Sequence, residues 1–298
     1  LHTYNFACAE YAAPAWLAGV PVRVHAEHGR DASDPQGLNP KHNFLRRALV
    51  PFIDRYVPVS HDLHRWLTDV VRIPAAKSEL IMNGVDTVRF APDLPVAATP
   101  WAGEDVFVIG TVGRLQDVKD QASLVEAFAL LRARGANARA RLAVVGDGPL
   151  RDKLAQKAHA LGVQDLVWLP GARNDIPELM RAFDVFALSS IAEGTPVTLL
   201  EAMACGLPIV GTNGGGVAEL VDRETGILAE PNNVDSLAGA IEAVYARQLA
   251  ELGANARRKA AEYYDWNEIL PQLMRRYQAV LGTRERDEPG TERVCVTD

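Results

Sequence analysis

The stretch SSIAEGTPVTLLEAMACGLPIVGT, residues 189–212, holds the pattern that decides the fold. An apolar run ends at Ser190, where a strand would finish. Pro196 suits the first position of a helix with Thr195 as its N-cap, and Gly206 suits the residue after the helix end. A second apolar run follows at once. A strand, a helix and a second strand in this order are the repeating unit of a parallel α/β sheet.

Short apolar runs alternate with helix-length amphipathic segments along most of the chain. Two series of strands are predicted, at residues 20–29, 55–60 and 79–85 in the first part, and then at residues 105–115, 140–148, 165–171, 184–190, 207–212 and 225–230. Between two of them, residues 121–135 predict a helix that buries Leu124 and Phe128. Repeated units of this kind predict parallel sheets covered by helices on both faces.

The chain of 298 residues is long enough for two domains, each with its own core. Prolines and small residues gather in residues 86–105, which indicates a linker. We therefore predict an N-terminal domain over residues 1–92 and a C-terminal domain over residues 93–264. A helix is predicted over residues 265–283, and the polar tail, residues 284–298, has little to bury and is expected to be disordered.

The composition is that of a globular protein and excludes some functions. Hydrophobic residues make up 48% of the chain and charged residues 23%, and the net charge of −7 is not that of a nucleic-acid-binding protein. Cys8, Cys205 and Cys295 are far apart and lack the spacing of a metal site, which favours a reduced, cytoplasmic setting. The longest uncharged run, residues 202–218, is rich in glycine and is not a membrane span.

Two glutamates flank the turn in the opening stretch. The turn places the N-terminus of a helix at the carboxyl end of a parallel strand, where open α/β sheets bind ligands. Free N–H groups of Thr195, Val197 and Thr198 can hold an anion there. Glu193 lies just before the turn and Glu201 about 7–8 Å along the helix axis, so both are hydrogen-bond acceptors beside the anion. This layout fits a nucleotide-sugar, which has hydroxyls at each end and a diphosphate between them.

The phosphates of such a ligand need cations. Arg114 and Lys119 lie five residues apart in a glycine-bearing loop, GRLQDVK, that directly follows a strand. Arginine can hold two phosphate oxygens at once, whereas lysine acts as a point charge. No pair of carboxylates with DxD-like spacing is present, so we expect no divalent metal and no further cofactor.

Two further segments leave alternatives open. In KHNFLRRALVPF, residues 41–52, apolar side chains gather on one side of a predicted helix, and Arg46 and Arg47 lie off it. This side is expected to face the core, and the alternative is a helix that faces a membrane. The glycines of TNGGGVAEL, residues 212–220, either form a flexible turn or let the backbone approach a ligand closely.

Several separated segments resemble family 4 of the retaining glycosyltransferases. EGTPVTLLE, residues 193–201, matches the E-x7-E element of that family, and GRLQDVKD, residues 113–120, resembles its G-R-L…K loop. Segments that resemble the family in the same order are NGVD, VPVSHDL and VWLPGARNDIPELMRAFDVFALSS. The match covers residues 1–281, and residues 1–31 are similar to sugar transferases associated with bacterial exopolysaccharide gene clusters.

The resemblance implies the GT-B fold, in which two doubly wound, Rossmann-like parallel-sheet domains face each other across a cleft. The C-terminal domain would bind the nucleotide-sugar donor and the N-terminal domain the acceptor, with the helix at residues 265–283 crossing back to the N-terminal domain. The family has a glycine-rich loop after its first strand. None precedes Leu1, so the N-terminal domain is expected to be truncated.

The resemblance also implies the roles of individual residues. Glu201 would bind the nucleotide ribose, Glu193 would face the donor sugar, and Arg114 and Lys119 would hold the diphosphate. The donor-binding residues that it implies are Gly113, Arg173, Gly194, Thr195, Pro196, Val197 and Glu201, with Arg173 in the loop that holds the base. The catalytic residues that it implies are His28, Arg114, Lys119 and Glu193. His25 is the alternative to His28 as the histidine near the donor sugar.

The resulting hypothesis is a metal-independent, retaining enzyme of the hexosyltransferase type. It would move a sugar from a nucleotide-diphosphate sugar to a hydroxyl of a glycan or lipid-linked acceptor, in exopolysaccharide or other cell-surface glycan biosynthesis. A cytoplasmic location at the inner face of the membrane, with peripheral membrane contact, is expected. The alternatives are a nucleotide-sugar-binding module without transferase activity and a GT-B nucleotide-sugar epimerase. The base, the sugar, the acceptor and the oligomeric state stay open.

Overall fold

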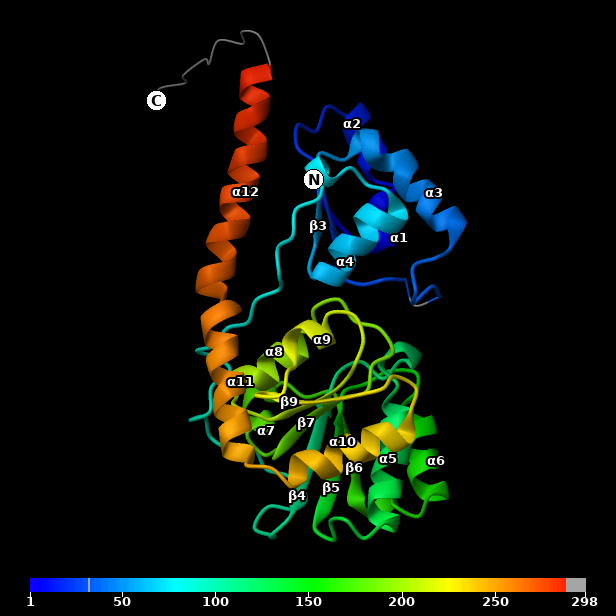
Figure 1. Ribbon diagram of the computed structural model, residues 1–298, viewed down its shortest axis with the longest axis vertical. Helices are drawn as coiled ribbons and strands as arrows, with labels where there is room; N and C mark the ends of the chain where they lie inside the picture. The colour runs from blue at the N-terminus through cyan, green and yellow to red at the C-terminus, as the bar shows by residue number, and fades with distance from the viewer. Residues whose placement is uncertain (32, 288–298) are drawn as a thin grey trace.

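The computed structural model describes residues 1–31 and 33–287, which form two α/β domains (Figure 1). The smaller domain has a three-stranded parallel sheet of β1 (His2–Tyr4), β2 (Val24–Glu27) and β3 (Arg55–Pro58), in that order. β2 is buried along its whole length and β3 nearly so, as expected for parallel strands that are covered on both faces.

Helices cover one face of this sheet, and the C-terminal helix covers the other. The helices on the first face are α1 (Asn5–Ala9), α2 (Ala12–Leu17), α3 (Pro40–Leu49) and α4 (His61–Arg65), which continues as a π-helical turn over Trp66–Val71. They enclose a core that contains Tyr56. On the other face, Ile269 of α12 (Trp266–Asp287) packs with Val24 and Val57 of the sheet.

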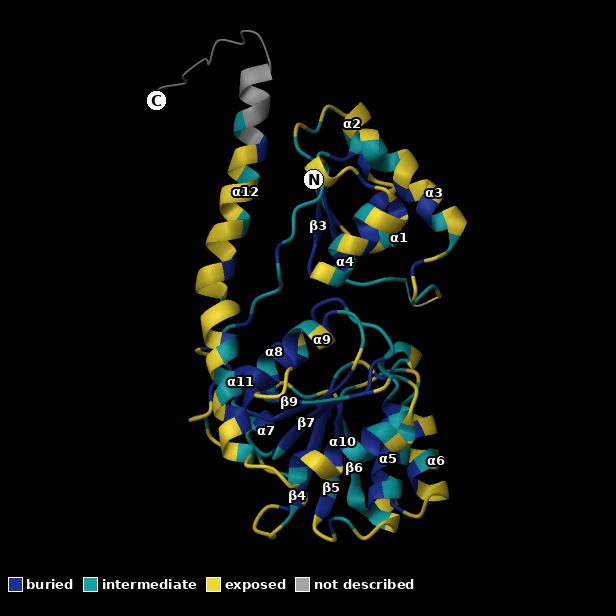
Figure 2. Cartoon of the chain, viewed as in Figure 1, coloured by how far each residue is buried: buried dark blue, intermediate teal, exposed yellow. Residues whose placement is uncertain are grey.

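The larger domain has a six-stranded parallel sheet, whose strands are largely buried (Figure 2). Its strands lie in the order β6-β5-β4-β7-β8-β9 and are β4 (Phe107–Val112), β5 (Ala140–Val145), β6 (Val167–Gly171), β7 (Val185–Leu188), β8 (Ile209–Thr212) and β9 (Gly226–Ala229). The chain runs from β4 outward to β6 and then returns to the other side of β4 with β7. This order is doubly wound, with its topological switch point between β4 and β7. The predicted fold class is confirmed.

Helices cover both faces of the larger sheet. They are α5 (Gln121–Ala133), α6 (Arg151–Ala160), α7 (Ile176–Met180), α8 (Val197–Ala204), α9 (Val217–Leu220), α10 (Val234–Tyr245) and α11 (Leu249–Tyr263). α5, α6 and α10 contribute to one apolar cluster, and α7, α8 and α9 contribute to the other. α5 buries Leu124 and Phe128 fully and ends before Gly135, whose φ is +68°. The helix predicted there is confirmed.

α12 runs beside both domains (Figure 1). It begins after Asp265, whose carboxylate caps it by accepting a hydrogen bond from Asn267 N at 2.7 Å. It ends at Asp287, beyond the predicted end at residue 283. The rest of the predicted tail, residues 288–298, lies outside the described residues.

One predicted strand is wrong. Residues 79–85 follow β3 without forming a strand of either sheet. Glu79 N and Ile81 N donate to carbonyls of β3 at 2.9 and 3.1 Å, and Val85 then pairs with Asp265 at the start of α12. The segment carries the chain out of the smaller domain, so its backbone leaves β3 before a regular ladder can form.

Candidate functional site

The loops that follow β4 and β7 meet at the switch point of the larger sheet. Lys119, in the 3-10 turn after β4, has its Nζ 2.5 Å from Oε1 of Glu193, in the loop after β7. The hydroxyl of Ser190 donates to the same carboxylate oxygen at 2.6 Å. Two site residues that were predicted from separate motifs, Lys119 and Glu193, are thus brought into direct contact.

The Lys119–Glu193 pair is partly buried and leaves capacity for a ligand. The exposed fractions of the two side chains are 24% and 11%. An ammonium group has three N–H donors, and among the described residues Glu193 is the one acceptor of Lys119 Nζ. Lys119 can therefore hold a phosphate oxygen while it stays paired with Glu193.

Arg114 lies in the loop after β4, and its side chain is exposed. Within the described part of the chain its guanidinium has no ion pair or hydrogen bond. The backbone of the loop is fixed, because the Arg114 carbonyl accepts from Gln121 Nε2 at 3.0 Å and Leu115 N donates to Asp147 O at 3.0 Å. An added Cβ at Gly148 would lie 2.8 Å from Leu115 N, so this glycine lets the loop after β5 pack closely against the loop after β4. An unpaired cation on a fixed loop is suited to bind an anion.

The turn that precedes α8 faces the smaller domain. A Cβ added to Gly194 would collide with the carbonyl of His28, just after β2. The Thr195 hydroxyl donates to the carbonyl of Val59, and the Thr195 carbonyl accepts from Asn83 Nδ2 at 2.8 Å. The turn therefore lies at the contact between the two domains.

Helix α8 begins one residue later than predicted. Pro196 has an extended backbone, with a ψ of 115°, and takes the N-cap position, so α8 starts at Val197. The prediction of Thr195 as the N-cap is wrong, because its hydroxyl is used in the bond to the smaller domain. The N–H groups of Val197 and Thr198 have no acceptor among the described residues. They stay available to an anion, which the helix dipole also favours.

Glu201 lies one turn further along α8, on the same partly open face as Val197. Its half-buried carboxyl has no hydrogen-bond donor in the part of the chain that the structure describes. Burial raises the pKa of Glu201 to about 7, and the charge of Arg89 opposes this rise. A half-buried acid without a donor has hydrogen-bonding capacity that a ligand hydroxyl can satisfy.

The glycine-rich loop before α9 packs against the backbone around Glu193. Gly216 N donates to the Glu193 carbonyl at 3.2 Å. An added Cβ on Gly215 would collide with that carbonyl, and one on Gly216 would collide with the carbonyl of Gly194. These glycines therefore let two loops approach closely and fix the position of the acidic turn.

Arg173 follows β6, toward the edge of the sheet. The loops after β4, β5 and β6 lie side by side, because Gly113 N donates to a carbonyl of β5 and Gly146 N to a carbonyl of β6, both at 3.0 Å. Arg173 forms a bidentate pair with Asp175 at 2.8 and 2.5 Å, and this hydrogen bonding raises the pKa of Arg173. Gly113 thus lies in the same loop as Arg114, whereas Arg173 lies after the edge strand and is paired with Asp175.

The structure separates the two candidate histidines. His25 is buried in the smaller domain, with Nδ1 2.8 Å from Thr3 Oγ1 and Nε2 3.4 Å from the Glu27 carboxylate. His28 lies just after β2 and lines a cavity of about 180 Å³ together with Asn83 and residues of α12. Burial lowers the pKa of His28, and the charge of Glu27 opposes this shift. Of the two histidines, His28 has the ring that a ligand can reach.

Sequence reasoning missed Glu219 of α9, which also joins the domains. Its carboxylate accepts hydrogen bonds from His61 N at 2.9 Å and Asp62 N at 2.7 Å, at the start of α4 in the smaller domain. No local signal marks this contact, because its partners lie in the other domain. Asn83 belongs to the NGVD segment, but its bond to the turn before α8 was not predicted either.

Gly194→Ala is expected to open the contact between the domains, because its Cβ would collide with the His28 carbonyl. Hydrogen exchange at the amides of His61 and Asp62, which are bonded across the interface, should then become faster by about tenfold or more. Gly239→Ala in α10 is the matched control, since nothing lies within 4 Å of its added Cβ. Equal exchange rates in the two variants would contradict the assigned contact.

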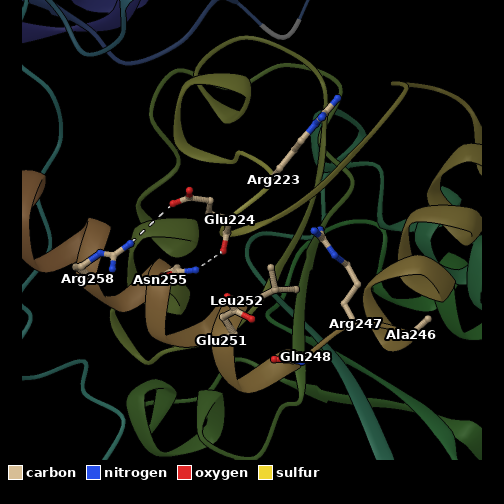
Figure 3. Close-up of a pocket in the computed structure, with 9 residues that line it drawn as sticks. All are labelled: Arg223, Glu224, Ala246, Arg247, Gln248, Glu251, Leu252, Asn255 and Arg258. Atoms are coloured by element: carbon tan, nitrogen blue, oxygen red, sulfur yellow. Dashed lines mark hydrogen bonds and ion pairs between the residues drawn. The ribbon is translucent and has the colours of Figure 1, made fainter.

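A cavity of about 760 Å³ lies between the loop before β9 and the start of α11 (Figure 3). Most of its charged lining side chains are exposed, and Figure 3 shows Arg258 paired with Glu224. Open α/β sheets bind ligands at the carboxyl ends of their strands, whereas this cavity adjoins the amino end of β9. We therefore place the functional site at the switch point between β4 and β7.

Residues 100–263, more than half of the chain, match the family model described as Glycosyl transferases group 1. The chain belongs to this glycosyltransferase family. Residues 1–89 match a second model, described as Glycosyltransferase Family 4. Both parts of the chain thus agree with the resemblance drawn from the motifs.

The chain is similar to a Bacillus subtilis (strain 168) protein described as glycosyltransferase EpsF, with 33% identity over 266 residues, 87% of this chain and 66% of the relative. It is also similar to the Escherichia coli UDP-Gal:alpha-D-GlcNAc-diphosphoundecaprenol alpha-1,3-galactosyltransferase, with 30% identity over 235 residues, 76% of this chain and 61% of the relative. The chain spans about two thirds of the length of these curated relatives.

The fold is similar to that of Anabaena Alr3699/HepE, solved in complex with UDP and glucose. The TM-score is 0.80 at 24% identity, over 93% of this chain and 77% of that chain. Together with the two parallel sheets, this likeness confirms the GT-B fold predicted for the chain.

Proposed function

We propose that this glycosyltransferase moves a hexose, with retention and without a metal, from a nucleotide-diphosphate sugar to an acceptor hydroxyl. The observation that carries the proposal is the contact of Lys119 with Glu193 beside the N-terminus of α8. A cation, an acid and unpaired N–H groups thus lie together at the switch point, where such sheets bind ligands. These groups match the phosphates and hydroxyls of a nucleotide-sugar in charge and in hydrogen bonding.

The donor would lie across this site. Its diphosphate would contact Arg114, Lys119 and the free N–H groups of α8. Among the described residues, Arg114 and these N–H groups have no hydrogen-bond partner, and Lys119 keeps N–H donors beyond its bond to Glu193. Its ribose hydroxyls would donate to Glu201, whose carboxyl has no donor among the described residues. Its sugar would lie near Glu193, and its base near the loop after β6.

Transfer breaks the bond between the anomeric carbon and a phosphate oxygen, and the electron pair goes to the phosphate. Arg114, Lys119 and the N–H groups of α8 would stabilise this charge, because Lys119 and the helix are held in place before the reaction and Arg114 is carried on a fixed loop backbone. On the retaining route, the acceptor oxygen bonds to the anomeric carbon on the face from which the phosphate leaves. The leaving phosphate takes the acceptor proton, and His28, which lies across the domain contact from Gly194, would orient the acceptor.

The proposed acceptor is a glycan or a lipid-linked sugar in exopolysaccharide or other cell-surface glycan synthesis, used at the inner face of the membrane. The Escherichia coli relative supports a lipid-linked acceptor, since its name gives a diphosphoundecaprenol-linked sugar as the acceptor. No helix among the described residues is long and apolar enough to cross a bilayer. A peripheral membrane contact would then bring the enzyme to such an acceptor.

Thermal unfolding in the presence of UDP-, GDP- and ADP-sugars tests donor binding. One of them is expected to raise the unfolding midpoint, because a ligand that binds the folded state stabilises it by mass action. Transfer is then measured with that donor and a lipid-diphosphate-linked sugar. The product should keep the anomeric configuration of the donor, as read by NMR, and EDTA should leave the rate unchanged.

Other results would replace the proposal. Stabilisation without product would indicate a nucleotide-sugar-binding module. Conversion of the nucleotide-sugar without an acceptor would indicate an epimerase. A product with inverted configuration, or a rate that EDTA abolishes, would contradict retention or metal independence respectively.

A further inference from the structure

Helix α3 exposes large apolar side chains near its middle and buries two polar ones beside them. Asn43 and Arg46 are only 5% and 3% exposed, whereas Phe44 and Leu45 are 64% and 50% exposed. Leu49 and Phe52 pack partly against the core, as expected, but Phe44, Leu45 and Ala48 are exposed. The expectation that the apolar side of this helix faces the core is therefore met only in part. A helix of a globular protein normally buries its apolar stripe, so the exposure of Phe44 and Leu45 needs an explanation.

Buried contacts hold α3 in this orientation. Arg46 Nε donates to Oε1 of Glu27 on β2 at 3.0 Å, and neither side chain is more than 3% exposed. The Arg46 guanidinium also lies 4.3 Å from the ring centre of Phe6 and 4.7 Å from that of Trp66. Rolling the helix to bury its apolar side would leave the Glu27 charge buried and unpaired, which is strongly unfavourable. The outward apolar side is thus fixed by the fold.

The apolar surface continues from α3 onto α2. The ring of Trp16 on α2 lies 5.5 Å from that of Phe52, in the 3-10 turn that directly follows α3. Trp16 and Leu17 are 49% and 77% exposed. Figure 2 shows exposed residues along the outer sides of both helices. We call this surface, made by Trp16, Leu17, Phe44 and Leu45, the α2–α3 face.

The charge along the α3 part of the α2–α3 face is positive. Residues 37–53 contain no Asp or Glu. Lys41 and Arg47 are exposed, and neither has a partner for its charge among the described residues. The nearby Asp34 carboxylate accepts hydrogen bonds from Leu38 N and Asn39 N, just before α3, at 3.0 and 2.8 Å. Apolar side chains flanked by free cations are the combination that binds the surface of an anionic membrane.

We propose that the α2–α3 face docks on anionic lipid headgroups, with Phe44, Leu45 and Trp16 entering the interface and Lys41 and Arg47 contacting phosphates. This inference deepens the membrane contact proposed above. Figure 1 shows α2 and α3 on the outer side of the smaller domain, so docking leaves the switch point of the larger sheet free. The acceptor-side domain would then be held at the surface that carries a lipid-linked acceptor.

The test is sedimentation of the whole chain with vesicles of phosphatidylcholine, with and without phosphatidylglycerol. The protein should bind the anionic vesicles and bind the neutral ones much more weakly. Phe44→Ser with Leu45→Ser, and separately Lys41→Glu with Arg47→Glu, should each lower binding by about tenfold or more. The assay contains neither donor nor acceptor, so failure to bind vesicles and failure to transfer a sugar are observed separately.

Matched controls lie on the larger domain. Leu161→Ser replaces an apolar side chain that is 42% exposed, and Lys153→Glu reverses an exposed charge on α6. Both should bind vesicles as the wild type does, and thermal unfolding should show that all variants are folded. Equal vesicle binding by the α3 variants and the controls would overturn the proposal. So would a concentration-dependent dimer that is lost in Phe44→Ser with Leu45→Ser while vesicles are not bound, since a second copy would then cover the face.

Discussion

Lys119→Met is expected to lower kcat/KM for sugar transfer by about a hundredfold to a thousandfold. The Lys119 ammonium would stabilise the charge that develops on the leaving diphosphate, and methionine keeps much of the side-chain length without the charge. The change also leaves the Glu193 carboxylate with Ser190 as its remaining donor. Initial rates over a range of donor concentrations measure the effect. The fall should lie mainly in kcat, because the charge is largest in the transition state.

Lys157→Met is the matched control, because Lys157 also pairs with a glutamate, Glu126, between α5 and α6. It should leave transfer unchanged. Both variants should keep the wild-type fold, since exposed and partly exposed ion pairs contribute only about 0–1 kcal/mol to stability. A kcat/KM for Lys119→Met within about twofold of the control would mean that Lys119 does not stabilise the charge on the leaving diphosphate.

Much of the site could be predicted because its features are local in the sequence. Apolar periodicity gave the strand and helix around the acidic turn, and α8 ends before Gly206 as expected. Apolar periodicity also predicted the strand before the loop that carries Arg114 and Lys119, and β4 lies there. Loops that follow neighbouring parallel strands lie at the same edge of the sheet, which explains why Lys119 meets Glu193.

Two of the errors arose where the partner of a residue lies far away in the chain. Thr195 has the right chemistry for an N-cap, but its hydroxyl bonds to Val59 of the other domain. Periodicity placed the whole apolar side of α3 in the core, but Arg46 is held inward by Glu27 on β2, and Phe44 and Leu45 are exposed. The sequence around Thr195 or Arg46 does not contain these partners. Caps and amphipathic stripes are therefore predictable only where no distant polar group competes for the same side chain.

Glu201→Gln is expected to stabilise the protein without ligand. Burial raises the pKa of Glu201 to about 7, above its ordinary value of 4.5. Between these two values the folded protein binds more protons than the unfolded chain, so its stability falls as the pH rises through this window. Glutamine carries no charge to bury. Above a pH of about 7 the variant should be more stable by about 1–3 kcal/mol, and below about 4.5 the difference should vanish.

Donor binding should change in the opposite direction. The ribose hydroxyls would donate to the Glu201 carboxylate, and a hydrogen bond to a charged group contributes about 1.5–3 kcal/mol, so the variant should bind the donor about tenfold or more weakly. Wild-type affinity should increase as the pH rises through about 7, where Glu201 ionises, and the affinity of the variant should not. Calorimetric titration with the stabilising nucleotide-sugar measures both effects.

Glu251→Gln, at an exposed position on α11, is the control and should change neither stability nor affinity. A glutamate that serves the fold would lower stability when it is replaced, so a less stable Glu201→Gln above pH of about 7 would contradict the assignment. Unchanged donor affinity would contradict it as well. For a ligand site, the substitution is expected to raise stability and lower donor affinity. The half-buried carboxylate lacks a donor among the described residues of the free protein and gains one from the bound ribose.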